Sequence, residues 1–168
     1  MLVSEKLGNI KDVEVNDRLI DYLSLEWYET NKRILHKFTQ SGKQVTLRFL
    51  KENQKLTPGD IIYEDNESII AIDVVPCEAI IIRPLSMYEM AAICYEIGNK
   101  HLPLFFENNE LLVPFEMPLF NLLTATGHNV KKEVRKLINP LRSSVAPHGH
   151  GKGNSVSIIL ERTISPDE

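Results

Sequence analysis

The chain has 168 residues, of which 43% are hydrophobic and 25% are charged, and its formal net charge is −4. This composition excludes collagen-like, disulfide-framework and disordered chains, and the negative charge disfavours a nucleic-acid partner. The sequence shows no apolar run of the ~18–20 residues that a membrane helix needs, and its first residues lack a signal-peptide pattern. We therefore expect a soluble cytoplasmic protein with neither a nucleic-acid nor a membrane partner.

Residues 1–75 are predicted to form an all-β domain of short strands. Two apolar-rich runs, residues 32–38 and 44–49, flank a turn that contains Gly42. The second run alternates polar and apolar residues with a period of two, so its apolar side chains share one face. These runs are predicted to pair as a hairpin. The Pro-Gly pair at 58–59 predicts a turn before the following strands.

Residues 76–138 predict a second domain with the element order β-α-β-β-α-β, the ferredoxin-like arrangement. Its strands are expected at residues 79–82, 102–106, 110–115 and 130–138. Its second helix is expected to begin at Pro118, to end at Gly127 and to bury Leu119, Leu122 and Leu123. Because helices cover only one face of such a sheet, the other face is expected to contact the first domain or a second copy.

The first helix of this domain has well-marked ends. Ser86 and Glu89 have the S-x-x-E spacing of a capping box. Gly98 and Asn99 are predicted to stop the helix, because both residue types tolerate the left-handed conformation. His101 follows just beyond this stop. Apolar residues between the two ends recur at helical spacing and predict one buried face: Met90, Ile93, Cys94 and Ile97.

Residues 139–168 are predicted to form a flexible tail, because their prolines, glycines and serines cannot bury a core. The tail contains His148 and His150, separated by one glycine. Short histidine tracts of this kind bind metal ions. The tail histidines are therefore candidate metal ligands.

The known enzyme motifs with a glycine-rich loop, a nucleophile elbow or paired metal ligands are absent from the sequence, so catalysis is not expected. Cys77 and Cys94 lie in apolar contexts and are predicted to pack as small hydrophobic residues. His36 and His128 are predicted to be surface or capping histidines. His101 on its own is typical of a cation at the carboxyl end of a helix, with metal ligation as the alternative.

Several separated segments resemble UreE-type urease accessory proteins, the nickel metallochaperones. Residues 92–104 contain the sequence YEIGNKH, which is similar to the YEIGNRH stretch of that family. Segments that are similar to the family's amino-terminal domain lie at residues 7–10, 25–35 and 56–63. The resemblance extends over residues 1–138, and the histidine-bearing tail fits it too.

The resemblance implies a function and a set of ligands. In that family an amino-terminal β-domain, likened to a peptide-binding co-chaperone domain, precedes a metal-binding and dimerisation domain and a variable tail. The match implies that His101, which closes the GN(R/K)H motif, binds Ni(II) at a homodimer interface. It implies His148 or His150 as the auxiliary ligand, and Zn(II) is a second candidate ion for this site. The implied partners are the urease accessory GTPase and, through it, the urease apoprotein assembly complex.

Two departures from the family pattern limit what is expected. Some members have an H-x-H pair where this chain has Phe115-Glu116-Met117, so no second metal site is expected there. With only two tail histidines, delivery of about one ion per dimer is expected rather than storage. The competing hypothesis is a non-metal adaptor or co-chaperone whose β-domain binds a client segment by edge pairing.

Overall fold

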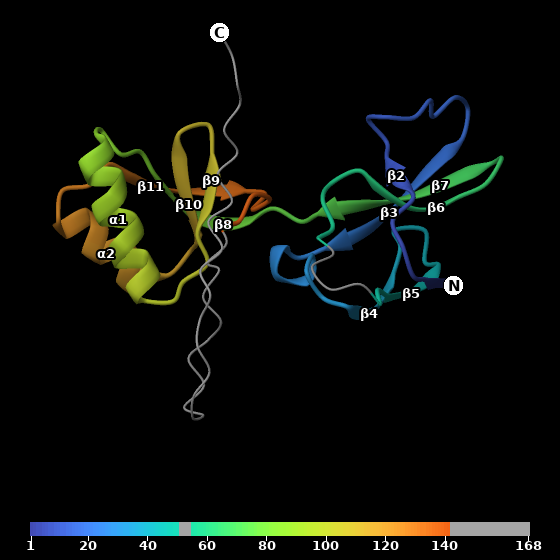
Figure 1. Cartoon of the computed structure of the whole chain (residues 1–168), viewed down its shortest axis with the longest axis horizontal. Coiled ribbons are helices and arrows are strands. Elements are labelled where there is room, and N and C mark those ends of the chain that lie inside the picture. Colours follow the sequence, from blue (N-terminus) through green and yellow to red (C-terminus); the bar gives the residue numbers. More distant parts are fainter. Residues whose placement is uncertain (51–54, 142–168) are drawn as a thin grey trace, which may run out of the picture.

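The structure is a computed structural model that describes residues 1–50 and 55–141. In these residues an N-terminal part built from two β-sheets adjoins a C-terminal part in which two helices lie on a third sheet (Figure 1). The fold class predicted from the sequence is therefore confirmed. The predicted tail lies outside the described residues from residue 142 onward. The described residues include no helix that is long and apolar enough to cross a membrane.

The N-terminal part contains a three-stranded and a four-stranded sheet. The first has the order β1 (Leu2–Val3), β5 (Gln44–Arg48), β4 (Ile34–Phe38). The second has the order β2 (Gly8–Asn9), β6 (Asp60–Glu64), β7 (Ser68–Val74), β3 (Leu19–Leu25). A short 3-10 helix, η1 (Trp27–Glu29), follows β3.

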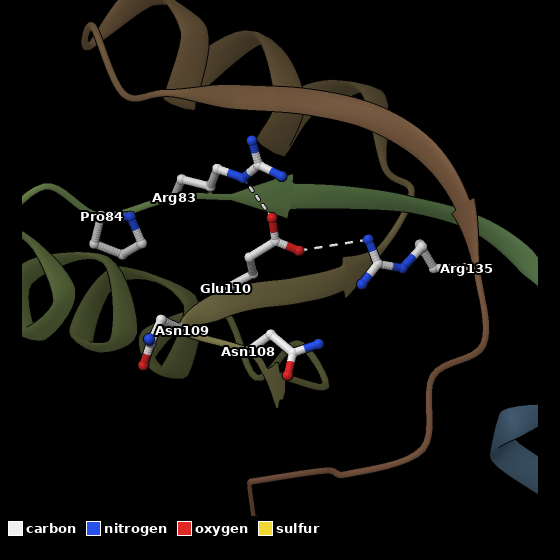
Figure 2. A pocket seen from close by; sticks show the side chains of 6 residues that line it. All are labelled: Arg83, Pro84, Asn108, Asn109, Glu110 and Arg135. Carbon is white, nitrogen blue, oxygen red and sulfur yellow. Dashed lines mark hydrogen bonds and ion pairs between the residues drawn. The ribbon is translucent and has the colours of Figure 1, made fainter.

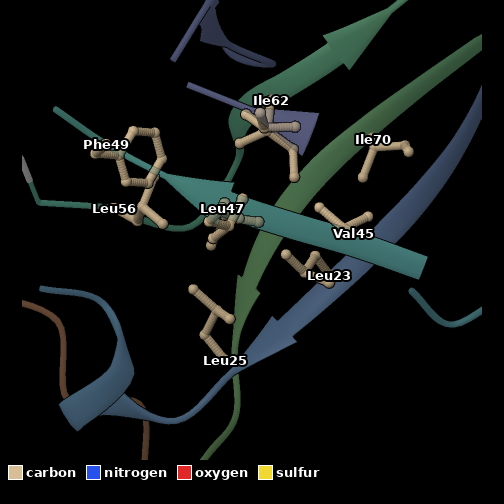
Figure 3. Close-up of a cluster of buried hydrophobic side chains, with 10 residues drawn as sticks. Leu23, Leu25, Val45, Leu47, Phe49, Leu56, Ile62 and Ile70 are labelled. Carbon is tan, nitrogen blue, oxygen red and sulfur yellow. The ribbon is translucent and has the colours of Figure 1, made fainter. Parts of the chain in front are cut away.

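The inner faces of these two sheets share one hydrophobic core (Figure 3). Val45, Leu47 and Phe49 are at most 2% exposed, so the predicted alternation along β5 is confirmed. They pack with residues from the other sheet, among them Leu23 on β3 and Ile70 on β7. The predicted hairpin is also present, because β4 pairs antiparallel with β5.

The predicted turn at Pro58 and Gly59 fixes β2 against β6. Gly59 has φ +84°, and a Cβ atom built there would lie 2.9 Å from the side-chain oxygen of Asn9, so only glycine fits without strain. The amide of Asn9 donates to the Pro58 carbonyl at 3.1 Å and to the buried Asp60 carboxylate at 3.0 Å. Two of the segments with family resemblance thus contact each other here.

The C-terminal part follows the predicted order β-α-β-β-α-β. Its elements are β8 (Cys77–Ile82), α1 (Met87–Asn99), β9 (Phe105–Glu107), β10 (Glu110–Pro114), α2 (Met117–Ala125) and β11 (Val130–Arg135). The antiparallel sheet has the order β11-β8-β10-β9, the ferredoxin-like topology. The last strand ends at Arg135, three residues before the predicted boundary.

The two helices cover one face of this sheet. Ile93 and Ile97 of α1 are buried there, and Met90 and Cys94 pack against the same cluster, as predicted. Leu119 and Leu123 of α2 are buried, whereas Leu122 is 37% exposed. The prediction that Leu122 faces inward is wrong, because the buried face is centred on Leu119 and Leu123 and Leu122 lies at its edge.

The opposite face of the sheet contacts the N-terminal part. Trp27 from η1 packs against a cluster that contains Ile81, Phe105 and Leu137, and its ring meets the Phe105 ring edge-on at 5.6 Å. Lys136 also forms a 2.6 Å ion pair with Asp73. Of the two contacts that the sequence allowed for this face, the structure therefore shows the one between the two parts.

Candidate metal centre

His101 occupies a special backbone position at the end of helix α1. The helix ends at Asn99, Lys100 is its C-cap, and the residue with a left-handed backbone is His101, with φ +55°. The prediction that Gly98 and Asn99 supply this conformation is therefore wrong. A histidine with positive φ is uncommon, and such residues concentrate at functional sites.

Two backbone hydrogen bonds hold His101 in this conformation. The His101 N–H donates to the Gly98 carbonyl at 3.0 Å, and the Leu102 N–H donates to the Ile97 carbonyl at 3.4 Å. This is the Schellman arrangement, in which an apolar contact accompanies the cap. Here Leu102 packs against the cluster that contains Ile97. The cap therefore fixes where the His101 side chain leaves the backbone.

The His101 side chain is exposed and has no hydrogen bond or ion pair with any described residue. The other two histidines in residues 1–50 and 55–141 have partners. His36 Nδ1 lies 2.9 Å from Thr46 Oγ1, and His128 Nδ1 lies 2.7 Å from Glu89 Oε1. Among the described histidines, His101 alone has both ring nitrogens available to an external ligand.

The cysteines contribute to packing, as predicted. Cys77 and Cys94 are half-buried thiols at the edges of the two clusters on the third sheet. Burial raises the pKa of both thiols, and the nearby Glu26 carboxylate raises that of Cys77 further. A raised pKa disfavours the thiolate that metals bind. Within the described residues, no three His, Cys, Asp or Glu side chains form a group that could hold a metal ion.

The last described residues lie beside the segment that follows His101 in the chain. Asn139 accepts a hydrogen bond from Phe106 N–H at 3.0 Å, and Leu141 N–H donates to the Leu104 carbonyl at 2.7 Å. Pro140 bridges Phe105 in antiparallel fashion. The chain is therefore attached beside Leu104, three residues after His101, at residue 141. His148 and His150 lie outside the described residues.

A pocket of about 570 Å³ lies near the other end of α1 (Figure 2). It is lined by Arg83, Pro84, Asn108, Asn109, Glu110 and Arg135. The buried Glu110 carboxylate accepts hydrogen bonds from Arg83 Nε and, at 3.4 Å, from Arg135 Nη1. Asn108 and Asn109 have positive φ, as the predicted tight turn requires. Sequence reasoning missed the pocket because its residues come from separate parts of the chain: the segment after β8, the turn between β9 and β10, and strands β10 and β11.

The comparisons with known proteins give the same family for both parts of the chain. The family model described as UreE urease accessory protein, N-terminal domain, matches residues 3–75, and the model for the C-terminal domain matches residues 78–157. The chain is 44% identical over 156 residues to "Urease accessory protein UreE" of Flavobacterium johnsoniae, covering 93% of this chain and 94% of that one.

Two further relatives with the same name are more distant. The chain is 38% identical over 153 residues to the protein of Haemophilus influenzae, covering 89% of this chain and 82% of the relative. It is 37% identical over 153 residues to that of Helicobacter pylori, covering 88% and 89%. Since both domain models and full-length relatives agree, the chain belongs to the UreE family of urease accessory proteins.

Proposed function

We propose that this protein is a nickel metallochaperone and not an enzyme. It binds Ni(II) through His101 at a homodimer interface and delivers the ion for assembly of the urease active site. The observation that carries this proposal is the His101 imidazole, which is exposed, without a partner among the described residues, and held at a left-handed helix cap. Zn(II) is the competing ion.

The ligand chemistry suits a carrier. Imidazole nitrogen is a good ligand for nickel and for zinc, and exposed imidazoles with open coordination positions allow an ion to leave again. A closed thiolate site would hold the ion more firmly, and the half-buried cysteines are poorly suited to build one. A site of few histidines therefore favours transfer over storage.

A dimer would supply a second copy of His101. Ala92, Tyr95 and Asn99 are exposed and share one face of the last turns of α1. Tyr95 is 72% exposed, and tyrosine is enriched at protein interfaces. A two-fold axis beside this face would bring the two His101 side chains together, because such an interface repeats the same residue from both subunits.

The attachment of the chain beside Leu104 supports the tail histidines as auxiliary ligands. Seven residues separate Leu141 from His148 and can span up to about 24 Å, whereas the three from His101 to Leu104 span at most about 11 Å. Either His148 or His150 can therefore reach His101 without any movement of the described residues. We propose them as ligands that complete the coordination shell.

The proposed division of labour follows from these assignments. Residues 1–75 bind partner proteins, residues 76–138 bind metal and dimerise, and residues 139–168 supply the tail histidines. The proposed partners are the urease accessory GTPase and, through it, the urease apoprotein. This transfer takes place in the cytoplasm.

Calorimetric titration of Ni(II) into the full-length protein tests the proposal. We expect one ion per two chains, and a homodimer in analytical ultracentrifugation. His101→Ala should weaken the tightest site by at least about 100-fold, the loss of about 3 kcal/mol that removing a key ligand causes. His36→Ala is the matched control and should bind as the wild type does. Unchanged affinity in a folded His101→Ala dimer would refute the assignment.

The tail is tested separately. The double variant His148→Ala, His150→Ala should lower nickel affinity by about tenfold, one lost ligand bond being worth about 1.4 kcal/mol here. X-ray absorption should show fewer histidine ligands in this variant than in the wild type. Equal histidine counts would remove the tail from the site and leave the His101 assignment intact.

The alternative function is a non-metal adaptor, and one observation favours it. Strand β4 is a terminal strand of its sheet, and its outward side chains Ile34 and Phe38 are 59% and 66% exposed. An open strand edge of this kind can pair with an extended segment of another protein. The adaptor would bind its client equally well without metal, and it would show no stoichiometric, histidine-dependent nickel binding.

A further inference from the structure

The start of helix α1 presents an unusual amount of apolar surface. Leu85, Met87 and Tyr88 are 83%, 87% and 86% exposed, the highest values among the large apolar side chains that the structure describes. Contiguous exposed apolar surface on a water-soluble domain marks an interaction site more often than chance. These three residues, together with Arg83, are called the α1 entry surface below.

The backbone under this surface is held in place. Ser86 Oγ accepts a hydrogen bond from Glu89 N–H at 3.1 Å, and Glu89 Oε2 accepts one from Leu85 N–H at 2.6 Å. An apolar residue before a helix usually packs back onto the first turn. Leu85 does not do so, although its backbone is fixed. Leu85 is therefore exposed even though its backbone is held in one conformation.

Arg83 adds a polar group at the edge of the pocket in Figure 2. Its Nε pairs with Glu110, while its two terminal nitrogens have no partner among residues 1–50 and 55–141. Glu110 also pairs with Arg135, which in turn pairs with Glu107 and Glu133. Lys131 pairs with Glu133, so the three carboxylates of this network are matched by three cations, Arg83 included. The terminal N–H groups of Arg83 can therefore donate two parallel hydrogen bonds to a carboxylate, and such pairs are strong.

We propose that the α1 entry surface docks a segment of a partner protein in which a carboxylate lies next to apolar side chains. The carboxylate would pair with Arg83 beside Asn108 and Asn109, and the apolar side chains would cover Leu85, Met87 and Tyr88. Arginine, tyrosine and methionine are enriched in such interfaces. The proposal goes beyond nickel binding and does not depend on it.

The charges on this surface favour a different protein over a second copy of the chain. In a symmetric contact, each copy would have to offer a free carboxylate from this same surface. Glu110 is buried and already paired, and Glu89 is held by His128 and by the Leu85 N–H. Helix α1 is about 20 Å long, so a partner docked at its start leaves the His101 end uncovered.

A pair of short peptides tests the carboxylate. One probe is the blocked tripeptide acetyl-Leu-Glu-Leu-amide, and the other has glutamine in place of glutamate. In an NMR titration of the full-length protein, the glutamate peptide should bind at least tenfold more tightly. Its resonance shifts should include the side chains of Arg83, Asn108 and Asn109. Affinities within twofold of each other, or shifts located elsewhere, would overturn the proposal.

Matched variants test each half of the surface. Arg83→Gln should abolish the preference for glutamate, whereas Arg48→Gln, at an exposed arginine on β5, should retain it. The double variant Met87→Ser, Tyr88→Ser should weaken both peptides at least fivefold, and Leu19→Ser, at a residue 76% exposed on β3, should change neither. A preference that survives Arg83→Gln would refute the carboxylate site.

Two further results keep the test decisive. If Arg83→Gln does not fold, Arg83→Lys keeps the charge but not the planar fork, and it should lower the glutamate preference at least threefold. The same samples are titrated with nickel, where Arg83→Gln should bind like the wild type. If Met87→Ser, Tyr88→Ser turns a dimer into a monomer in ultracentrifugation, the surface is an interface between copies and the proposal is wrong.

Discussion

The two helices of the C-terminal part end in the same way but use different residues. At α2, Gly127 has φ +81°, its N–H bonds to Thr124, and the next residue bonds to Leu123. At α1, His101 takes the place that Gly127 holds at α2. The shared geometry shows that the fold requires a left-handed residue at each helix end, and it does not require a histidine at either.

This difference distinguishes Gly127, which serves the fold, from His101, the proposed nickel ligand. A left-handed conformation costs a residue with a Cβ atom roughly 1–2 kcal/mol, and glycine avoids this cost. The histidine beside the α2 cap, His128, is paired with Glu89, whereas His101 has no partner among the described residues. The α1 cap thus keeps a strained, unpartnered histidine where glycine would be more stable.

Acid should have the largest effect, because it should weaken nickel binding at His101. A histidine binds nickel only as neutral imidazole, and the ordinary pKa of this residue type is about 6.5, so protons compete with the metal for histidine ligands in mild acid. Two copies of His101 and one or two tail histidines should make the affinity fall by about three or four decades per pH unit. Nickel dissociation constants between about pH 7.5 and 5.5 measure this slope, and His128→Ala should not change it. A flat profile would point to carboxylate ligands.

Replacement of the glycine tests the structural cap. Gly127→Ala should lower the free energy of unfolding by about 1–2 kcal/mol, because alanine must then adopt the left-handed conformation. Urea denaturation measures the loss. Gly98→Ala is the control, since Gly98 lies within α1 with open space around it, and it should raise stability by up to about 1 kcal/mol. A cost for Gly98→Ala as large as that for Gly127→Ala would contradict this account.

The reverse replacement tests the α1 cap, which carries the proposed nickel ligand. His101→Gly should raise the free energy of unfolding by about 0.5–1 kcal/mol, because relief of strain is partly offset by the greater freedom of glycine in the unfolded chain. The same variant should lose the tight nickel site. Stability measured by urea and nickel binding measured by calorimetry should therefore move in opposite directions. A loss of both would indicate that His101 serves the fold.

Local sequence patterns predicted much of the fold, because the determining interactions are short-range. The Ser86 cap, the alternation along β5 and the positive φ at Gly59 are set by the local chain, whereas the close approach of Asn9 to Gly59 is long-range. The end of α1 was predicted at Gly98 and Asn99 from their conformational tolerance. The contact of Leu102 with the core placed the left-handed residue at His101 instead.

Long-range pairings were not accessible to the same reasoning. Strand β3 pairs in parallel with β7, far along the chain, and Trp27 packs on the sheet of the C-terminal part. The pocket around Glu110 likewise joins residues from separate parts of the chain. The candidate ligand His101 was found from the family resemblance, since a histidine after a helix is by itself typical of a simple cap.

The smallest effect concerns the pair that distinguishes His128 from His101. The Leu85 N–H and then His128 lower the pKa of the Glu89 carboxyl below its ordinary value of 4.5. A depressed pKa means that the ionised group stabilises the fold above the ordinary pKa, and that this stabilisation is lost as the pH falls through the folded pKa.

Glu89→Gln should therefore lower the melting temperature slightly at pH 7, and its difference from the wild type should shrink below about pH 4.5. Glu96→Gln, which removes only an exposed pair with Lys100, is the control and should show a smaller change at pH 7. A Glu89→Gln difference that stays constant down to about pH 3 would mean that the effect of the substitution does not come from the charge of the carboxylate. In that case His128 would be held by packing instead of by the carboxylate.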